Sequence, residues 1–118
     1  MARILIIDDD ELICQSLSLV ARQKGYEVRS ANTLGDGLEK VTNEPFDVVF
    51  LDVNMPDGNG LDFLSKLPKL PSSPEIIIIT GYGDPNGAEL AIKYGAWDYL
   101  EKGAWVKEIT LSLMRALE

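Results

Sequence analysis

A series of short, continuous apolar segments constrains this chain more than any other feature. Three of them, rich in β-branched residues, read "RILIID" (residues 3–8), "FDVVFLD" (46–52) and "EIIIIT" (75–80). A strand is apolar at successive positions when both of its faces are buried, whereas a half-exposed strand alternates apolar and polar residues. These segments are therefore predicted to be central strands of a sheet that is covered on both sides.

Two more polar segments, "YEVRSA" (26–31) and "WDYLEK" (97–102), have strand length and are predicted to lie nearer the sheet edges. Helical patterns follow the five strands, and we expect helices at residues 10–23, 34–43, 60–67, 85–94 and 105–117. Because parallel strands are joined by right-handed crossovers, this alternation predicts a doubly wound α/β domain with one parallel sheet. In such sheets, functional residues gather at the carboxyl ends of the strands.

Composition fits this picture and excludes several functions. A length of 118 residues with 46% hydrophobic content suits one domain with one core and leaves no room for a second. Acidic residues outnumber basic ones by 19 to 11, and the net charge of −8 argues against binding to nucleic acid or to an anionic membrane surface. An acidic surface suits divalent cations or basic partners, and it equally serves solubility.

Neither a membrane span nor a secretory signal is expected. No apolar run approaches the ~18 residues of a span, and the N-terminus "MARILIIDDDE" turns acidic where a signal peptide would stay apolar. The single cysteine, Cys14, cannot form an internal disulfide and is predicted to be a small, mostly buried helix residue. We therefore expect a cytoplasmic protein.

Polar residues stand where four of the predicted strands end. They are Asp8 and Asp9 at the first strand, Asp52 at the third, Thr80 at the fourth and Lys102 at the fifth. Because the carboxyl ends of parallel strands meet at one edge of a sheet, these side chains are expected to converge. Three carboxylates repel one another and require a counter-charge, which Lys102 and a hard divalent cation such as Mg²⁺ would supply.

Each of these residues also has an ordinary structural explanation. An Asp after a strand is often a turn former or a helix cap, and a Thr or Lys there is usually structural or solvated. The recurrence of polar residues at the same strand ends favours a site. Asp52 is the most informative, because the apolar run before it predicts a partly desolvated carboxylate. Such a group beside a metal ion is positioned to attack phosphorus and form an aspartyl phosphate.

Four segments carry a resemblance to a known family over essentially the whole chain. They are "IIDDDE", "LDVNMPDGNG" with its D-x-x-M-P pattern, "IIIITGYGD" and "GAWDYLEKG". In this order and spacing they resemble the receiver domain of bacterial two-component response regulators. The resemblance implies a flavodoxin-like (βα)5 domain with strand order 2-1-3-4-5 over residues 1–118, which is either the whole protein or the N-terminal fragment of a longer regulator. It also implies that a sensor histidine kinase or a phosphotransfer domain passes a phosphoryl group to Asp52.

The same resemblance implies the metal ligands. Asp9 and Asp52 would bind Mg²⁺ or Mn²⁺, and Asp8 would act as an acidic neighbour, directly or through water. The backbone carbonyl of Asn54 would complete the protein ligands.

For the response to phosphorylation, the resemblance implies three further residues. Thr80 would hydrogen-bond the phosphoryl group, Lys102 would pair with its charge, and Tyr99 would swing inward as an aromatic switch when Thr80 moves. Receivers usually follow this lysine with a proline in a cis peptide, whereas Gly103 stands here. A non-proline cis bond costs ~2.5–4 kcal/mol, so we expect a trans or mobile Lys102–Gly103 bond and a looser loop from which Lys102 still reaches the site.

Helix patterns indicate where the signal enters. In the first helix, Ile13, Leu17 and Val20 form the predicted buried stripe, with Leu12 and Leu19 at its margin. A kinase or phosphotransfer domain would use that margin to approach Asp52. The sequence contains no histidine, so the phosphoryl donor must be another molecule.

The fourth and fifth helices are expected to carry the signal out. Their predicted inner residues are Ala88, Ala91 and Ile92 in the fourth helix and Val106, Ile109, Leu113 and Leu117 in the fifth. This arrangement leaves Leu90, Tyr94 and Leu111 on the outer side. We hypothesise that these three residues belong to a face for dimerisation or for a partner, which is also where the family commonly signals.

Three classes of function remain open. The first is a switch that promotes its own phosphorylation and dephosphorylation without turning over a separate substrate. The second is a metal-dependent phosphatase of the haloacid dehalogenase type, which typically places a second acid two residues after the nucleophile, where Asn54 stands. The third is a receiver-like scaffold that is not phosphorylated, and the retained acidic residues, Thr80 and Lys102 argue against it.

The downstream function is suggested by two variants of the motifs. The segments "TGYGD" and "MPDGNGLDFL" resemble receivers of transcription activators that carry an ATPase domain and act with an alternative sigma factor. This resemblance favours control of transcription through an output domain. A stand-alone regulator or a phosphorelay intermediate is the alternative.

Overall fold

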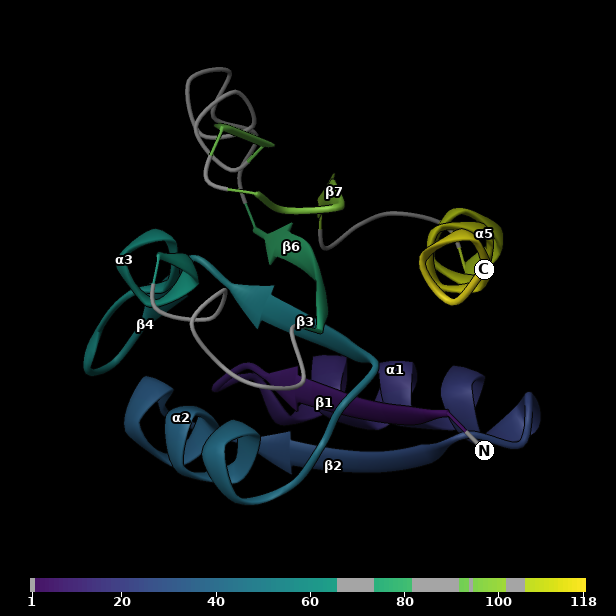
Figure 1. Ribbon diagram of the computed structural model, residues 1–118, viewed down its shortest axis with the longest axis horizontal. Helices are drawn as coiled ribbons and strands as arrows, with labels where there is room; N and C mark the ends of the chain where they lie inside the picture. The colour runs from purple at the N-terminus through teal and green to yellow at the C-terminus, as the bar shows by residue number, and fades with distance from the viewer. Residues whose placement is uncertain (1, 66–73, 82–91, 94, 102–105) are drawn as a thin grey trace.

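The computed structural model describes residues 2–65, 74–81, 92–93, 95–101 and 106–118, with the backbone alone for residues 106–107. Within these ranges a twisted five-stranded sheet lies between two groups of helices (Figure 1). The elements are, in chain order, β1 (Arg3–Ile7), α1 (Glu11–Gln23), β2 (Glu27–Ala31), α2 (Leu34–Asn43), β3 (Val48–Asp52), β4 (Asn54–Met55), β5 (Gly58–Asn59), α3 (Gly60–Leu64), β6 (Glu75–Thr80), β7 (Asp98–Glu101) and α5 (Val106–Ala116).

All five strands of the main sheet are parallel, in the order β2-β1-β3-β6-β7. Counted without the short β4–β5 pair, this is the predicted order 2-1-3-4-5, so the doubly wound α/β fold is confirmed. The predicted strands are all present, and β6 and α2 have the predicted bounds. Of the predicted fourth helix, only residues 92–93 belong to the described part of the chain, and they are helical.

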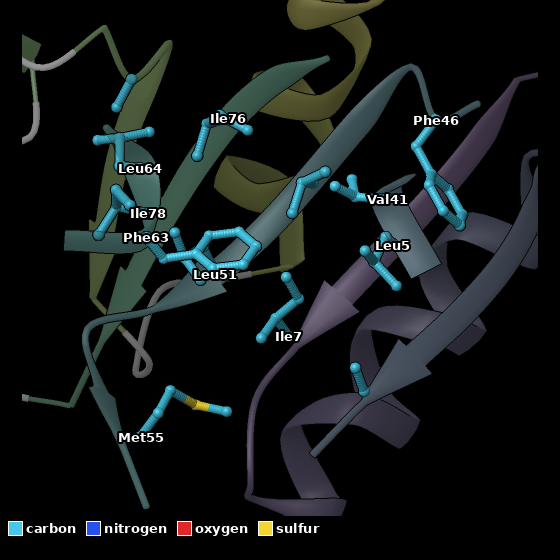
Figure 2. Close-up of a cluster of buried hydrophobic side chains, with 13 residues drawn as sticks. Leu5, Ile7, Val41, Phe46, Leu51, Met55, Phe63, Leu64, Ile76 and Ile78 are labelled. Atoms are coloured by element: carbon cyan, nitrogen blue, oxygen red, sulfur yellow. The ribbon is translucent and has the colours of Figure 1, made fainter. Parts of the chain in front are cut away.

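The central strands are buried on both faces, and alternate residues pack against different helices. In β1, Leu5 and Ile7 belong to an apolar cluster shared with α2 and α3, whereas Ile4 and Ile6 belong to a second cluster shared with α1 and α5. Figure 2 shows the first cluster, where side chains of β1, β3 and β6 meet those of the two covering helices. Each fully buried aliphatic or aromatic side chain contributes about 1.5–3 kcal/mol, so this two-sided core supports the sheet.

The buried face of α1 is turned slightly from the predicted one. The residues that α1 buries are Cys14, Leu17 and Ala21, which confirms the predicted burial of Cys14 and Leu17. Ile13 and Val20, which were predicted to be buried, are only half-buried. Helical spacing identifies the stripe but not its centre, and here the centre lies one residue further along the helix.

The later helices agree with the predicted faces at three positions and differ at one. Leu113 of α5 is buried, and Ile109 of α5 and Leu117 just after it pack partly buried against the same cluster, as predicted. Ile92 was predicted to face the sheet, but its side chain is 53% exposed, so that prediction is wrong. Ile92 lies where its helical segment ends, because the N–H of Gly95 donates to its carbonyl and the chain turns toward β7. Helical spacing therefore no longer sets which side chain faces the sheet.

At the amino ends of the strands, Arg3 joins three segments of the chain. Its guanidinium contacts the carboxylates of Glu44 at 2.6 Å and Glu27 at 3.0 Å and lies 5.3 Å from the ring centre of Phe46. Its backbone N–H donates to the carboxylate of Asp47 at 2.8 Å. The hydrogen bond with Glu44 is the main cause of the raised pKa of Arg3. This network stabilises the edge of the sheet that lies opposite the carboxyl ends of the strands.

None of the described helices is long and apolar enough to cross a membrane, and the longest, α1, has 13 residues.

One glycine of α2 packs so closely against β1 that it leaves no room for a side chain. A Cβ at Gly37 would lie 2.5 Å from the Cδ1 and 2.9 Å from the Cγ1 of Ile7, which is fully buried. A Cβ at Gly35, in the same helix, would lie 3.5 Å from the carboxylate of Asp57, which is an ordinary contact.

This contrast predicts different effects of the same substitution. Gly37→Ala and Gly35→Ala both gain helix propensity, so their difference reports the crowding against Ile7. We expect Gly37→Ala to have a free energy of unfolding about 1–3 kcal/mol lower than Gly35→Ala, measured by urea denaturation. Equal stabilities would show that β1 and α2 have room to move apart.

Candidate functional site

Asp52 ends the central strand of the sheet. It is the last residue of β3, which lies between β1 and β6 and is buried along all five residues. Its own exposure is 2%, and its Oδ1 accepts a hydrogen bond of 3.2 Å from the backbone N–H of Asn54. The apolar strand therefore carries one carboxylate to the carboxyl edge of the sheet and holds it there in an oriented position.

Asp8 and Asp9 follow the neighbouring strand β1. Because Ile7 pairs with Leu51 in the parallel register, the next residues of the two strands, Asp8 and Asp52, come side by side. Asp8 is fully buried, and its Oδ1 accepts a hydrogen bond of 2.9 Å from the backbone N–H of Asp10. Asp9 is exposed.

The three carboxylates form one cluster. One carboxylate oxygen from each of Asp8, Asp9 and Asp52 can be chosen so that all three lie within 4.8 Å of one another. The predicted convergence of these acidic residues is thus confirmed. Mg²⁺ binds oxygens at about 2.0–2.1 Å, so oxygens on opposite sides of one ion lie about 4 Å apart, and small side-chain rotations would bring the cluster to that spacing. This donor set fits a hard divalent cation, which would also relieve the repulsion among the acids.

Thr80 ends β6 on the other side of β3. Asp52 pairs with Ile79, so Thr80 stands one residue further along the neighbouring strand, and it is 3% exposed. In the next strand, Tyr99 pairs with Ile78 and packs half-buried against the same apolar cluster as Ile78. Side chains two residues apart in a strand point to the same face, so Thr80 and Tyr99 lie on one face of the sheet.

A short antiparallel pair of strands, β4–β5, connects β3 to α3 and was not predicted, because two-residue strands leave no periodicity in a sequence. It pairs Asn54 with Asn59 and Met55 with Gly58. Asn54, whose carbonyl is the expected metal ligand, lies at the open end of this hairpin, two residues after Asp52. Asn59 at the end of the hairpin caps α3, because its side-chain Oδ1 accepts a hydrogen bond of 2.8 Å from the N–H of Leu61.

Gly60 holds the start of α3 against the end of β3. Its N–H donates to the carbonyl of Val53 at 2.8 Å, and a Cβ at this position would overlap the backbone carbonyl of Asp52. Sequence patterns did not reveal this requirement. A glycine at the first position of a predicted helix is a signal that could have found it, because glycine has low helix propensity and needs another reason to be there.

Several predicted functional residues lie outside the described part of the chain. They are Lys102 with its bond to Gly103, and Leu90 and Tyr94 of the hypothesised partner face. Leu111, the third residue of that face, is described and is 45% exposed, as predicted.

Comparison with known proteins gives the class of this chain. It belongs to the response regulator receiver domain family, whose pattern matches residues 4–113. The general function of this family is phosphorylation-dependent signalling. Between the receiver and the haloacid dehalogenase type of phosphatase, the comparison decides for the receiver.

Two relatives are longer than the part of them that this chain matches. The photosynthetic apparatus regulatory protein RegA of Rhodovulum sulfidophilum is 32% identical over 111 residues, and the transcriptional regulatory protein ZraR of Klebsiella oxytoca is 36% identical over 114 residues. These matches cover 94% and 97% of this chain, but only 61% and 26% of the two relatives. The chain therefore spans only part of the length of these proteins.

Two solved structures share the fold closely. The beryllofluoride-activated NtrC4 receiver domain dimer has a TM-score of 0.93 and 38% sequence identity, and the match covers 99% of this chain and 97% of that one. A response regulator from Burkholderia pseudomallei, solved with a phosphorylated aspartic acid, a calcium ion and citrate, has a TM-score of 0.87 and 30% identity. That match covers 100% of this chain and 67% of the other.

The close contact at Gly60 predicts a sensitive position. In Gly60→Ala the new Cβ would meet backbone atoms of Asp52 and Val53, which cannot rotate away as the end of a side chain can. We expect the free energy of unfolding to fall by about 1–3 kcal/mol in urea denaturation. Gly35→Ala serves as the control, because it adds the same methyl group where there is room. A Gly60→Ala protein as stable as the wild type would contradict the close approach of α3 to β3.

Proposed function

We propose that this chain is a phosphorylation switch in which Asp52 accepts a phosphoryl group with the aid of Mg²⁺ or Mn²⁺. The observation that carries the proposal is the cluster of Asp8, Asp9 and Asp52 at the carboxyl edge of the central strands. Family membership supports it, because phosphorylation-dependent signalling is the family's general function. The structure with a phosphorylated aspartic acid and a calcium ion is that of a related protein, and it supports the same assignment by analogy.

The transfer is a displacement at phosphorus. A carboxylate oxygen of Asp52 forms a bond to the phosphorus atom of a phosphohistidine, the bond from phosphorus to the imidazole nitrogen breaks, and the imidazole leaves and takes up a proton. The N–H of Asn54, which donates to Oδ1 of Asp52, orients the carboxylate for this attack. A bound Mg²⁺ supplies charge neutralisation for the carboxylates and the phosphoryl oxygens. Asp9, Asp52 and the carbonyl of Asn54 would hold it, with Asp8 acting directly or through water.

The response begins on the neighbouring strands. A phosphoryl group adds roughly two negative charges and several acceptor oxygens to this edge of the sheet. In the proposal, the Thr80 hydroxyl donates to a phosphoryl oxygen and Lys102 pairs with the new charge. Tyr99 then moves inward into the space that Thr80 leaves. The support for this last step is that Thr80 and Tyr99 share one face of adjacent strands.

The phosphoryl group comes from another protein, a sensor histidine kinase or a phosphotransfer domain, because this sequence has no histidine. The proposed docking surface is the outer margin of α1, where Leu12 is 73% and Leu19 is 60% exposed. Both leucines lie on α1, which begins two residues after Asp9, so a partner bound there would be on the side of the domain from which Asp52 is approached. The chain itself promotes the gain and loss of the phosphoryl group and turns over no separate substrate.

For the output, we propose control of transcription in the cytoplasm through a further domain or a partner. ZraR, a relative, is named a transcriptional regulatory protein, and this chain spans only a quarter of its length. The NtrC4 receiver was solved as a dimer in its beryllofluoride-activated form, which favours dimerisation on phosphorylation. Leu90, Tyr94 and Leu111 would lie in the dimer interface, and the support from the described residues is the exposure of Leu111.

The central claim predicts the fate of one residue. On incubation with acetyl phosphate and Mg²⁺, the wild-type protein is expected to gain one phosphoryl group by mass spectrometry, whereas Asp52→Ala gains none. Chelation of the metal with EDTA should also prevent the adduct, because the carboxylate cluster then lacks the positive charge of the cation.

The exposed acid Asp62 of α3 provides the matched control, and Asp62→Asn should keep the adduct. An adduct that survived Asp52→Ala unchanged would refute the assignment of Asp52. A wild-type protein that is never phosphorylated would support the scaffold alternative.

The two proposed surfaces predict separable effects of two similar substitutions. Leu111→Asp on α5 should reduce phosphorylation-dependent dimerisation, measured by analytical ultracentrifugation, and leave transfer from the kinase intact. Leu19→Asp on α1 should slow transfer from the kinase and leave both dimerisation and phosphorylation by acetyl phosphate intact. Both leucines are exposed, so neither change creates a buried charge. If the two variants behaved alike, the division into an input face and an output face would be wrong.

A further inference from the structure

Asp57 makes a contact that the proposed mechanism does not use. It lies in the turn between β4 and β5, and its two carboxylate oxygens accept hydrogen bonds from the first turn of α2. Oδ1 accepts from the N–H of Leu34 at 2.8 Å, and Oδ2 accepts from the N–H of Gly35 at 2.9 Å. These N–H groups have no partner within their own helix, so the contact satisfies two donors of a segment that is more than 20 residues away in sequence.

The charge of Asp57 suits this position. A carboxylate at a helix N-terminus is stabilised by the helix dipole and by charge-assisted hydrogen bonds. The pKa of Asp57 is lowered from its ordinary value. The largest cause is the hydrogen bond from the N–H of Leu34, and the second is the one from Gly35. A lowered carboxyl pKa means that the contact stabilises the fold above that ordinary value and is lost as the pH falls through the lower value of the folded state. At neutral pH the group is therefore ionised and fully engaged.

Apart from Asp57, the turn meets α2 at the Leu34 side chain, whose Cδ1 would lie 3.3 Å from a Cβ at Gly58. A cavity of about 360 Å³ lies between them, and Leu34, Leu38, Asp57, Gly58 and Phe63 are among its lining residues. Side-chain packing across this gap is thus incomplete. Pro56, Asp57, Gly58 and Asn59 are all exposed, so the turn gains little from burial.

The same hairpin carries part of the candidate metal site. Asn54 begins β4 and pairs with Asn59 across the hairpin, and its N–H donates to the carboxylate of Asp52. Gly58, next to Asp57, has a φ of 154°, a conformation that favours glycine and sets the direction of the turn. A displacement of the turn would therefore be passed through two short strands to Asn54 and Asp52.

We propose that Asp57 is a positioning residue for the metal site, whose carboxylate fixes the β4–β5 hairpin to α2 and so holds Asn54 and Asp52 in the geometry that binds the cation. The inference rests on the proposed function, in which Asn54 and Asp52 are metal ligands. Partners that orient metal ligands without touching the metal commonly change metal affinity when they are removed. Asp57 acts in this way from the far end of the hairpin.

The test is the affinity of the complete chain for Mg²⁺, measured by isothermal titration calorimetry. Asp57→Ala, which loses both hydrogen bonds, should weaken Mg²⁺ binding about tenfold. Asp57→Asn keeps one acceptor oxygen and should show an intermediate loss. Phosphorylation by acetyl phosphate should slow in both variants at low Mg²⁺ and recover at saturating Mg²⁺, because the chemistry at Asp52 is unchanged.

Asp62→Asn removes one negative charge near Asp57 but keeps the hydrogen bonds between Asp57 and α2, so this variant should bind Mg²⁺ like the wild type. If Asp57→Asn and Asp57→Ala bound Mg²⁺ as tightly as the wild type and differed only in a lower free energy of unfolding, Asp57 would be a helix cap without a role at the metal site. That outcome would overturn the inference. Failure of the wild type to bind Mg²⁺, or equal binding by Asp9→Asn, would overturn the proposed function and this inference with it.

Discussion

The main physical constraint on this structure is the repulsion among the acidic groups that a parallel sheet brings to one edge. Asp8 and Asp52 are almost completely buried at the ends of adjacent strands, and the exposed Asp9 completes a cluster whose oxygens lie within 4.8 Å. Like charges at this distance in a poorly hydrated place raise the free energy of the folded chain unless positive charge is supplied. The apolar core on both faces of β1 and β3 therefore has to offset this repulsion. In the proposed mechanism, the relief of this crowding is the reason why the edge would respond to a cation and to a phosphoryl group.

The alternation of side chains along the strands separates two roles at this edge. In β3, Asp52 lies on the same face as Val48 and Phe50, which pack with residues of α1 and α5. In β6, Thr80 lies on the same face as Ile76 and Ile78, which pack with residues of α2 and α3. The proposed acceptor and the proposed responding hydroxyl thus begin from opposite faces and meet only at the rim. In the proposed mechanism, a charge added to Asp52 would affect the face that contains Tyr99 through Thr80 at the rim, although Asp52 itself begins on the other face.

The sequence predicted the features that depend on local patterns. Runs of apolar, largely β-branched residues identified the three central strands to within two residues, because burial on both faces leaves little ambiguity. The acids Asp8, Asp9 and Asp52 were predicted to converge, since their places at strand ends follow from the same pattern. Helix faces were less certain, because spacing gives a stripe without its centre, and Ile92 was misplaced where its helical segment ends.

What could not be predicted depends on contacts between segments that are distant in sequence. In the sequence, Asp57 is a turn residue after a proline, and nothing marks the N–H groups of Leu34 and Gly35 as its partners. In the sequence, Gly60 is only a residue of low helix propensity at the start of a helix, and the structure shows that the carbonyl of Asp52 leaves no room for a side chain there. Both residues act on the position of groups whose chemistry the sequence does reveal. In the proposed site, α2 and the β4–β5 hairpin would therefore tune the affinity for the cation without a change in any ligand, because affinity depends on where the ligands are held as well as on which groups they are.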